Sequence, residues 1–163
     1  MRKCCFIPLI ELCPSRDVAR LPPLLRDAEE GSARIIAALN DAAVVAYIAQ
    51  SDGNDVAAAA VRWAGGDSEI VYLATLETAR GQGYRAALMR GLIGEASARG
   101  VEALNVGTAN SSLQNIAFYQ KRGFRMASVR RDFFDYLPAP LCEDGIQMRD
   151  MLMLRLVVAG ATT

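Results

Sequence analysis

A glycine-rich hexapeptide is the segment of this sequence whose residue types and spacing best fit chemistry. It reads Arg80-Gly81-Gln82-Gly83-Tyr84-Arg85 and lies between a strand-like apolar run over 70–76 and a helix-like run over 84–99. Glycines at a strand-to-helix turn let backbone N–H groups converge on an anion, and the new helix adds its positive end. The pattern favours a phosphate or pyrophosphate ligand, but a tight turn without a ligand has the same local sequence.

The residue types that the chain lacks narrow the chemistry further. The sequence contains no histidine, which excludes Ser–His and Cys–His catalysis and most zinc sites. General acid or base catalysis is left to Tyr, Glu, Asp, Cys or Lys. The cysteines have the spacing of neither a metal site nor a disulfide framework; they are Cys4, Cys5, Cys13 and Cys142. We therefore predict no metal, and free thiols in a cytoplasmic protein.

Length and composition predict a single globular domain over residues 1–163. Apolar residues make up 52% of the chain and charged residues 22%, with a net charge of zero. This balance is usual for a globular protein and gives no sign of nucleic acid or an anionic membrane surface as a partner. No stretch approaches the ~20 apolar residues that span a membrane. Pro8 and Glu11 interrupt the apolar start of the chain, so we interpret it as a strand rather than a signal peptide.

The elements that must position the hexapeptide are a mixture of strands and helices. Periodicity and turn signals predict strands over 6–12, 44–50, 56–63, 70–76, 101–106, 124–131 and 151–158, and helices over 17–26, 29–39, 84–99 and 111–122. Asp52-Gly53 predicts an antiparallel hairpin between the second and third strands. Asn110 or Ser111 is expected as the N-cap of the last helix. The predicted fold class is mixed α/β.

A second segment makes the hexapeptide more specific. The last predicted helix ends in Tyr119-Gln120-Lys121-Arg122-Gly123-Phe124. Together the two segments resemble the signatures of the GCN5-related N-acetyltransferase (GNAT) superfamily, which are Arg/Gln-x-x-Gly-x-Gly/Ala and Tyr-x-x-x-Gly-Phe. The resemblance covers nearly all of the chain, and the C-terminal third is similar to one bacterial branch of that family. Arg85 departs from the pattern, because the family usually has Gly or Ala there.

The resemblance implies a fold and a cosubstrate. The fold is a mixed central sheet of about seven strands with helices on both faces, and its fourth and fifth strands splay apart to receive acetyl-CoA. The backbone of the fourth strand is expected to pair with the pantetheine arm, and the glycine-rich turn to hold the pyrophosphate. The cofactor-binding residues that this implies are Leu73, Ala74, Thr75, Arg80, Gly81, Gln82, Gly83, Tyr84 and Arg85.

Some side-chain roles stay open at this level. Arg80 either points to solvent or braces the turn. The guanidinium of Arg85 either reaches the phosphates of coenzyme A or lies exposed in the first helical turn. Many relatives carry an asparagine where this chain has Ser112. Here Asn110 or Asn115 either takes over its hydrogen bond to the cofactor or only caps or lines the helix.

The resemblance also implies an activity. It implies transfer of an acetyl group from acetyl-CoA to a primary amine of a small molecule or peptide, by direct attack in a ternary complex. Tyr119 is then the general acid that protonates the leaving thiolate. The general base is Glu69, Glu77, Asp132 or a chain of waters. The alternative is a non-catalytic acyl-CoA-binding or regulatory protein on the same fold, and either a monomer or a homodimer fits.

Overall fold

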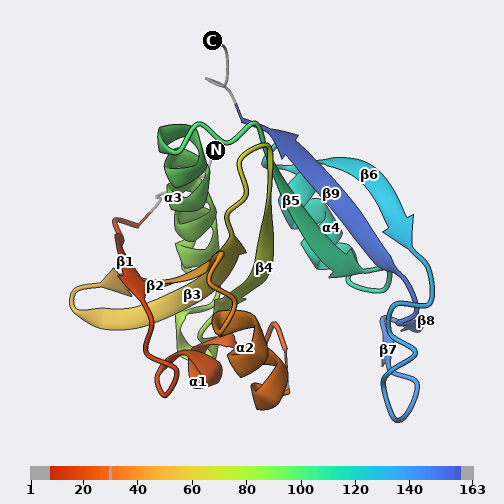
Figure 1. The fold of residues 1–163 in the computed structure, drawn as a ribbon. Coiled ribbons are helices and arrows are strands. Elements are labelled where there is room, and N and C mark those ends of the chain that lie inside the picture. The colour runs from red at the N-terminus through yellow and green to blue at the C-terminus, as the bar shows by residue number, and fades with distance from the viewer. Residues whose placement is uncertain (1–7, 30, 159–163) are drawn as a thin grey trace, which may run out of the picture.

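The chain folds into a mixture of strands and helices (Figure 1), as its sequence predicts. The computed structural model describes residues 8–29 and 31–158. The elements are β1 (Glu11–Ser15), α1 (Leu21–Leu25), α2 (Ser32–Leu39), β2 (Val44–Ser51), β3 (Asn54–Arg62), β4 (Asp67–Thr75), the 3₁₀ turn η1 (Glu77–Ala79), α3 (Tyr84–Ala98), β5 (Ala103–Ala109), α4 (Leu113–Gln120), β6 (Arg125–Arg130), β7 (Cys142–Glu143), β8 (Ile146–Gln147) and β9 (Met151–Val157). The turn η1 and the short strands β7 and β8 are additions to the predicted order.

A single mixed sheet organises the molecule and confirms the predicted strand number. It has seven strands in the order β1-β2-β3-β4-β5-β9-β6, and β7 and β8 form a separate small hairpin. The pairing of β4 with β5 is parallel, whereas the other neighbours in the sheet are antiparallel. Asp52 and Gly53 both have positive φ, which suits the tight turn of the predicted β2–β3 hairpin.

Helices cover both faces of the sheet, also as predicted. On one face, which we call the α3 face, Ile70 and Leu73 of β4 share a buried cluster with Leu88 of α3 and Tyr119 of α4. On the opposite α1 face, residues of α1 and α2 bury a second cluster, which includes Leu21, Leu25 and Ile35. Strand β3 lies between the two layers, and its residues Ala57 to Val61 have no exposed surface. Small side chains there let helices approach closely from both sides.

The first three predicted elements need corrected boundaries. The predicted strand over 6–12 falls partly on residues 1–7, which lie outside the described ones, and β1 instead begins at Glu11 and includes Pro14. An edge strand tolerates proline because one side of its backbone needs no partner. Helix α1 begins at Leu21 rather than 17, because the Asp17 carboxylate accepts hydrogen bonds from the amides of Ala19 and Arg20 and holds a turn. Helix α2 begins at Ser32, after Gly31 in an extended conformation.

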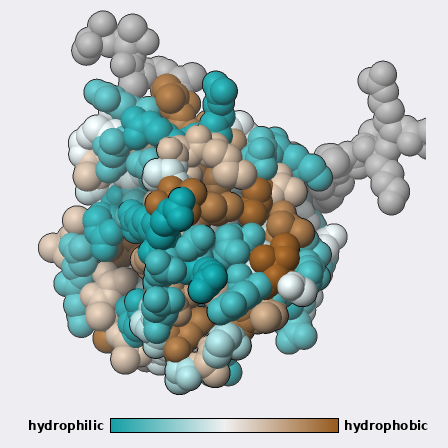
Figure 2. All heavy atoms as spheres, turned by 90° about the vertical axis from the view of Figure 1, so that its right-hand side faces the viewer, coloured by the Kyte–Doolittle hydropathy of each residue, from teal (hydrophilic) through white to brown (hydrophobic). Residues whose placement is uncertain are grey.

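The C-terminal edge of the sheet is much more open than its centre. All residues of β6 are exposed, including Met126 at 55% and Val129 at 51%. Figure 2 shows the side of the molecule on which β6 lies, where hydrophilic residues break up the hydrophobic patches. The connection over 131–150 reaches across to α2, because the Arg34 guanidinium lies 3.8 Å from the centre of the Tyr136 ring. Within the described part of the chain, the helices are too short or too polar to cross a membrane.

Candidate active site

Strands β4 and β5 separate in the middle of the sheet, as predicted. They pair from Asp67 and Ala103 up to Ile70 and Val106, and the pairing stops there. In the register with β3, Val71 is an extra residue of β4, and such a bulge bends a strand. Strand β4 therefore leaves β5 directly after Ile70. We call the diverging segments, 71–75 of β4 and 107–109 of β5, the β4–β5 split.

The split leaves hydrogen-bonding groups of the backbone free. Among the described residues, Leu73, Ala74 and Thr75 have no strand partner on the β5 side, because the ladder with β5 ends at Ile70 and Val106. Buried backbone groups in proteins are nearly always paired. An extended chain inserted beside β4 would therefore find a ready set of donors and acceptors, which is the property required for the pantetheine arm.

The hexapeptide forms the turn between β4 and α3, and we call residues 80–85 the donor turn. Gly81 and Gly83 have φ of 72° and 86°, in the left-handed region, and Gly83 directly precedes α3. Within the described residues, the amides from Gly81 to Ala86 donate no intramolecular hydrogen bond. Successive free amides at the positive end of a helix form an anion-binding concavity. The local geometry therefore suits a phosphate group.

Side chains of the donor turn hold it against its neighbours. Arg80 forms an ion pair with Asp27 after α1, so it braces the turn, in agreement with one of the two interpretations of the sequence. The Gln82 side-chain amide donates to the Thr78 carbonyl at 3.1 Å. The Tyr84 hydroxyl donates to the Ser51 hydroxyl at 3.4 Å. These side chains have partners within the protein, whereas the main-chain amides of the turn remain available for a ligand.

Arg85 reaches from the start of α3 to α4. Its guanidinium donates to the Asn115 side-chain oxygen at 2.8 Å and to the Tyr119 hydroxyl at 3.4 Å. The guanidinium carbon also lies 4.0 Å from the centre of the Phe118 ring. The solvent-exposed alternative for Arg85 is therefore wrong. Its contact with phosphates stays a prediction.

Tyr119 occupies a nearly dry position on α4. Its residue surface is 4% exposed, and its ring packs edge-on against Phe118 and Phe124. Burial raises the pKa of the Tyr119 phenol, whereas the charge and the hydrogen bond of Arg85 act in the opposite direction. The phenol consequently keeps its proton at neutral pH, which is the state that a general acid needs.

Two buried polar atoms near the split and the donor turn have no partner. Among the described residues, the buried side-chain atoms without a hydrogen bond are Thr75 Oγ1 and Arg85 Nε. Buried polar side chains in proteins generally find a partner. Thr75 lies two residues after Leu73 and so shares its α3 face. Both atoms belong to residues predicted to hold acetyl-CoA, and a polar ligand there would give them partners.

The predicted N-cap of α4 is wrong, because β5 is longer than its sequence pattern suggested. Strand β5 runs to Ala109, which places Asn110 at its end rather than at the helix. The Asn110 side chain accepts hydrogen bonds from the amides of Arg149 and Asp150 at 2.9 and 3.0 Å and donates to the Gln147 carbonyl at 3.0 Å. It therefore ties the segment before β9 to β5. Its role in cofactor binding stays a prediction, as does that of Asn115.

Ser112 precedes α4 and faces a carboxylate that the sequence did not single out. Its hydroxyl donates to Glu143 of β7 at 2.6 Å, and the buried Ser111 hydroxyl donates to the same oxygen at 3.3 Å. A carboxylate near the first turn of a helix is favoured by the helix dipole. Glu143 thus anchors the β7–β8 hairpin near the start of α4. Spacing alone could not identify it, since 31 residues separate it from Ser112.

The three candidate bases lie in different places. Glu69 forms part of the last paired segment before the split, and it points to the α1 face because its neighbour Ile70 points to the other. Arg62 lies 3.3 Å from its carboxylate and Arg130 lies 4.0 Å away. Glu77 and Asp132 are exposed, in η1 and in the connection after β6. Of the three, Glu69 is the one that lies in the paired part of β4 and β5, next to the start of the split.

Sequence reasoning missed a polar cluster on the α1 face. Tyr72 follows the bulge in β4, and its hydroxyl donates to the Arg34 carbonyl at 3.5 Å. Glu29 lies 3.5 Å from the Arg34 guanidinium, which stacks on Tyr136. Burial raises the pKa values of both tyrosines, and the Glu29 charge adds to the effect. These residues come from β4, the α2 region and the 131–150 connection, so no sequence motif joins them.

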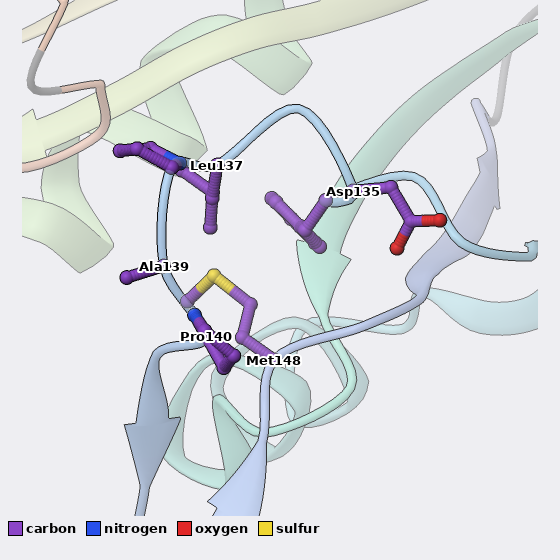
Figure 3. Close-up of a pocket in the computed structure, with 7 residues that line it drawn as sticks. Asp135, Leu137, Ala139, Pro140 and Met148 are labelled. Carbon is purple, nitrogen blue, oxygen red and sulfur yellow. The ribbon is translucent and has the colours of Figure 1, made fainter.

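A separate hollow lies within the 131–150 connection (Figure 3). It has a volume of about 170 Å³, and its lining residues are Phe134, Asp135, Leu137, Pro138, Ala139, Pro140 and Met148. These residues all belong to one segment of the chain, and β4, α3 and α4 contribute nothing. The hollow is therefore distinct from the donor turn and the split. Across the described ranges, no cluster of His, Cys, Asp and Glu is arranged to hold a metal ion.

Known proteins are similar to this chain in sequence and in fold. Residues 4–124 match the sequence model of the acetyltransferase (GNAT) family, and the chain belongs to that family. A Bacillus subtilis protein described as the uncharacterized N-acetyltransferase YvbK is 37% identical over 89 residues, which are 54% of this chain and 57% of YvbK. The chain thus spans little more than half of that relative.

Solved structures extend the likeness to almost the whole chain. A GNAT family acetyltransferase from Elizabethkingia anophelis, with acetyl-CoA bound, superposes with a TM-score of 0.83 at 29% identity. A Bacillus subtilis acetyltransferase in complex with CoA gives a TM-score of 0.81, also at 29% identity. Both comparisons cover 91% of this chain and 97% of the other. The split sheet and the two signature segments therefore belong to an established acetyltransferase fold.

Proposed function

We propose that this protein is an N-acetyltransferase that transfers the acetyl group of acetyl-CoA to a primary amine. The observation that carries the proposal is that the unpaired polar groups lie together. The free amides of the donor turn, the free backbone of β4, Thr75 Oγ1 and Arg85 Nε all lie in the segments predicted to hold the donor. The related structures with acetyl-CoA or CoA bound support this donor.

Donor binding would rest mainly on the backbone. Leu73, Ala74 and Thr75 would pair with the amides of the pantetheine arm, and the amides from Gly81 to Arg85 would hold the pyrophosphate. Tyr84 and Gln82 would keep the turn in place through their bonds to Ser51 and Thr78. The bound donor supplies a thioester, whose carbonyl is the electrophile. A rigid strand and helix start would place that carbonyl with little loss of entropy in the protein.

Tyr119 would supply the proton that the reaction consumes at sulfur. The amine nitrogen attacks the thioester carbonyl, the C–S bond breaks, and its electron pair goes to sulfur. The Tyr119 hydroxyl gives its proton to that sulfur, and the phenolate regains a proton released by the amine nitrogen through water. Positioned acids of this kind contribute about 10²- to 10⁴-fold in rate. The absence of histidine from the sequence favours this direct attack over a covalent acyl-enzyme.

The amine would approach from the α1 face. Helices α3 and α4 occupy the other face together with the donor turn, so the acceptor needs a different route to the split. Glu69 is the candidate base best placed for this route, since it points to the α1 face beside the end of the β4–β5 pairing. Arg62 and Arg130 would hold its carboxylate in place. Tyr72 and Tyr136 would contact the body of the acceptor.

A thiol-release assay tests the proposal. The protein is incubated with acetyl-CoA and a panel of amines that includes amino acids, polyamines, arylalkylamines and a peptide N-terminus, and free thiol and acetylated product are measured together. We expect amine-dependent release of coenzyme A with at least one class. Tight binding of coenzyme A without turnover on any amine would instead favour the non-catalytic acyl-CoA-binding alternative. A cytoplasmic location and a monomer or homodimer remain predictions.

A further inference from the structure

We propose that Arg85 is a positioning residue that couples the phosphates of the donor to the hydroxyl of Tyr119. In this arrangement, the Tyr119 hydroxyl is correctly positioned for proton transfer only when the bound donor carries its phosphates. The inference rests on the proposed function and adds a specificity to it, for thioesters of coenzyme A over phosphate-free thioesters. It concerns the one position where the donor turn departs from the pattern that it otherwise resembles.

The first support is the way in which Arg85 spans two helices. Its backbone belongs to the first turn of α3, whereas its guanidinium contacts Asn115 and Tyr119, which lie one turn apart on α4. The guanidinium fork is planar, so two partners held on one helix fix its orientation. Phe118 supports the fork from its ring face at 4.0 Å. Arg85 therefore sets the position of the Tyr119 hydroxyl relative to the donor turn.

The second support is that this guanidinium lacks a counter-charge. Among the residues that the structure describes, no carboxylate lies within ion-pair distance of Arg85, and its Nε is buried without a partner. The Arg122 guanidinium lies 3.6 Å from the centre of the Phe118 ring. The positive end of α3 adds to the same potential. A half-buried cation in this setting is stabilised when an anion arrives.

The third support is that one residue faces both partners. The Arg85 amide lies in the set of free amides at the donor turn, and its side chain ends at Tyr119. A glycine or alanine at this position would offer the amide alone. An anion bound by the amides of the donor turn would offset the positive charge at the start of α3. The guanidinium of the same residue would hold the Tyr119 hydroxyl. The anion site and the Tyr119 hydroxyl are then coupled, because the Arg85 side chain is long enough to join them.

The charges around Tyr119 define how its titration should respond. Arg85 approaches from α3, Arg122 lies in the turn directly after α4, and the strands beneath contribute apolar residues of the core, including Val106 and Leu154. Burial raises the pKa of Tyr119 and Arg85 lowers it. Removal of the Arg85 charge should therefore raise the pKa of the phenol further. The acid form would persist to higher pH, so the alkaline limb of kcat should move upward.

The test compares two donors and two substitutions. Arg85→Met removes the charge and keeps the length of the side chain, and Arg85→Lys keeps the charge without the fork. Arg90→Met, on the exposed surface of the same helix, is the matched control. Each protein is assayed with acetyl-CoA and with S-acetylpantetheine, which carries the same thioester without phosphates. Steady-state kcat and KM are measured over a range of pH.

With acetyl-CoA, we expect Arg85→Met to lower kcat about 10- to 100-fold, the scale of a hydrogen bond to a charged group. Arg85→Lys should recover part of this loss and restore the alkaline limb, and Arg90→Met should match the unchanged protein. With S-acetylpantetheine, Arg85→Met and the unchanged protein should differ by less than about threefold. Equal losses with both donors, or no loss with acetyl-CoA, would overturn the coupling.

Two further measurements keep this inference separate from the proposed function. Coenzyme A binding is followed by calorimetry, and ionisation of Tyr119 by ultraviolet difference absorption with Tyr119→Phe as the blank. Arg85→Met should weaken coenzyme A about tenfold without changing the affinity for pantetheine, and should raise the phenol pKa. If no amine supports turnover, the proposed function fails while these measurements still test Arg85. Unchanged coenzyme A affinity together with an unchanged phenol pKa would reject the role given to Arg85.

Discussion

The two halves of the sheet, on either side of the β4–β5 split, differ in how their structure is determined. In the half from β1 to β4, β3 is enclosed by helices on both faces, and Ala57 to Val61 have no exposed surface. In the half formed by β5, β9 and β6, the last strand is exposed along its whole length. Packing thus fixes the centre of the first half, at β3, far more tightly than the outer edge of the second half, at β6. The donor turn follows β4, the last strand of the first half.

The two halves also contribute different kinds of group to the site, main-chain groups in one and side chains in the other. The first half offers main-chain groups, namely the free edge of β4 and the amides of the donor turn. The second half carries α4, whose side chains Asn115 and Tyr119 face Arg85. A site divided in this way should separate donor affinity from turnover. Matched substitutions across the split can test that separation.

The largest effect is expected from a tyrosine pair. Tyr119→Phe, in the second half, removes the proposed acid and should lower kcat about 100-fold, with the dissociation constant of coenzyme A within about twofold. Tyr84→Phe, in the first half, removes only a 3.4 Å contact with Ser51 and should change neither quantity by more than about twofold. Steady-state kinetics and calorimetry measure the two quantities. Unchanged kcat in Tyr119→Phe would remove Tyr119 from the mechanism.

A valine pair tests the difference in packing itself. Val61 in β3 has no exposed surface, whereas Val129 in β6 is 51% exposed. Val61→Ala should lower the free energy of unfolding by about 2 kcal/mol, because it removes buried methyl groups and leaves a cavity. Val129→Ala should stay within about 0.5 kcal/mol. Urea unfolding measures both, and equal losses at the two positions would mean that β6 is covered in solution.

A glycine pair tests the backbone character of donor binding. Gly81 and Gly145 have φ of 72° and 77°, and a Cβ at either would meet nothing within 4 Å. Alanine should therefore cost about 1–2 kcal/mol of backbone strain at each position. Gly81→Ala should also weaken coenzyme A about tenfold, because the turn relaxes away from the conformation that aims its amides. Gly145→Ala, in the β7–β8 turn, should leave the affinity unchanged, and equal affinities in both variants would contradict this account.

Much of the first half could be predicted from the sequence, because its signals are local. Asp52-Gly53 specifies a hairpin turn by backbone geometry, and apolar periodicity with a following glycine specifies α3. The two signature segments predict that the donor turn and Tyr119 belong to one fold. The extra residue Val71 was not predicted, since a bulge depends on the register with β3 rather than on its own side chain.

The second half was harder to predict, because its contacts join distant segments. Asn110 has the residue type of a helix cap, but the end of β5 and the amides before β9 determine its partners. Glu143 and Tyr136 lie in a polar connection without periodicity, and their partners Ser112 and Arg34 are far away along the chain. Arg85 departs from a motif, and only the position of α4 shows where its guanidinium goes.

The smallest effect is expected from the ion pair that braces the donor turn. The side chains of Arg80 and Asp27 are 52% and 49% exposed, so solvent and salt screen their attraction. A double-mutant cycle with Arg80→Met and Asp27→Asn should give a coupling below about 1 kcal/mol in urea unfolding. Arg80→Met should change the coenzyme A affinity by no more than about twofold. A tenfold loss of coenzyme A affinity would show that Arg80 leaves Asp27 and contacts the donor. The first half would then bind the donor through a side chain as well as through its main chain.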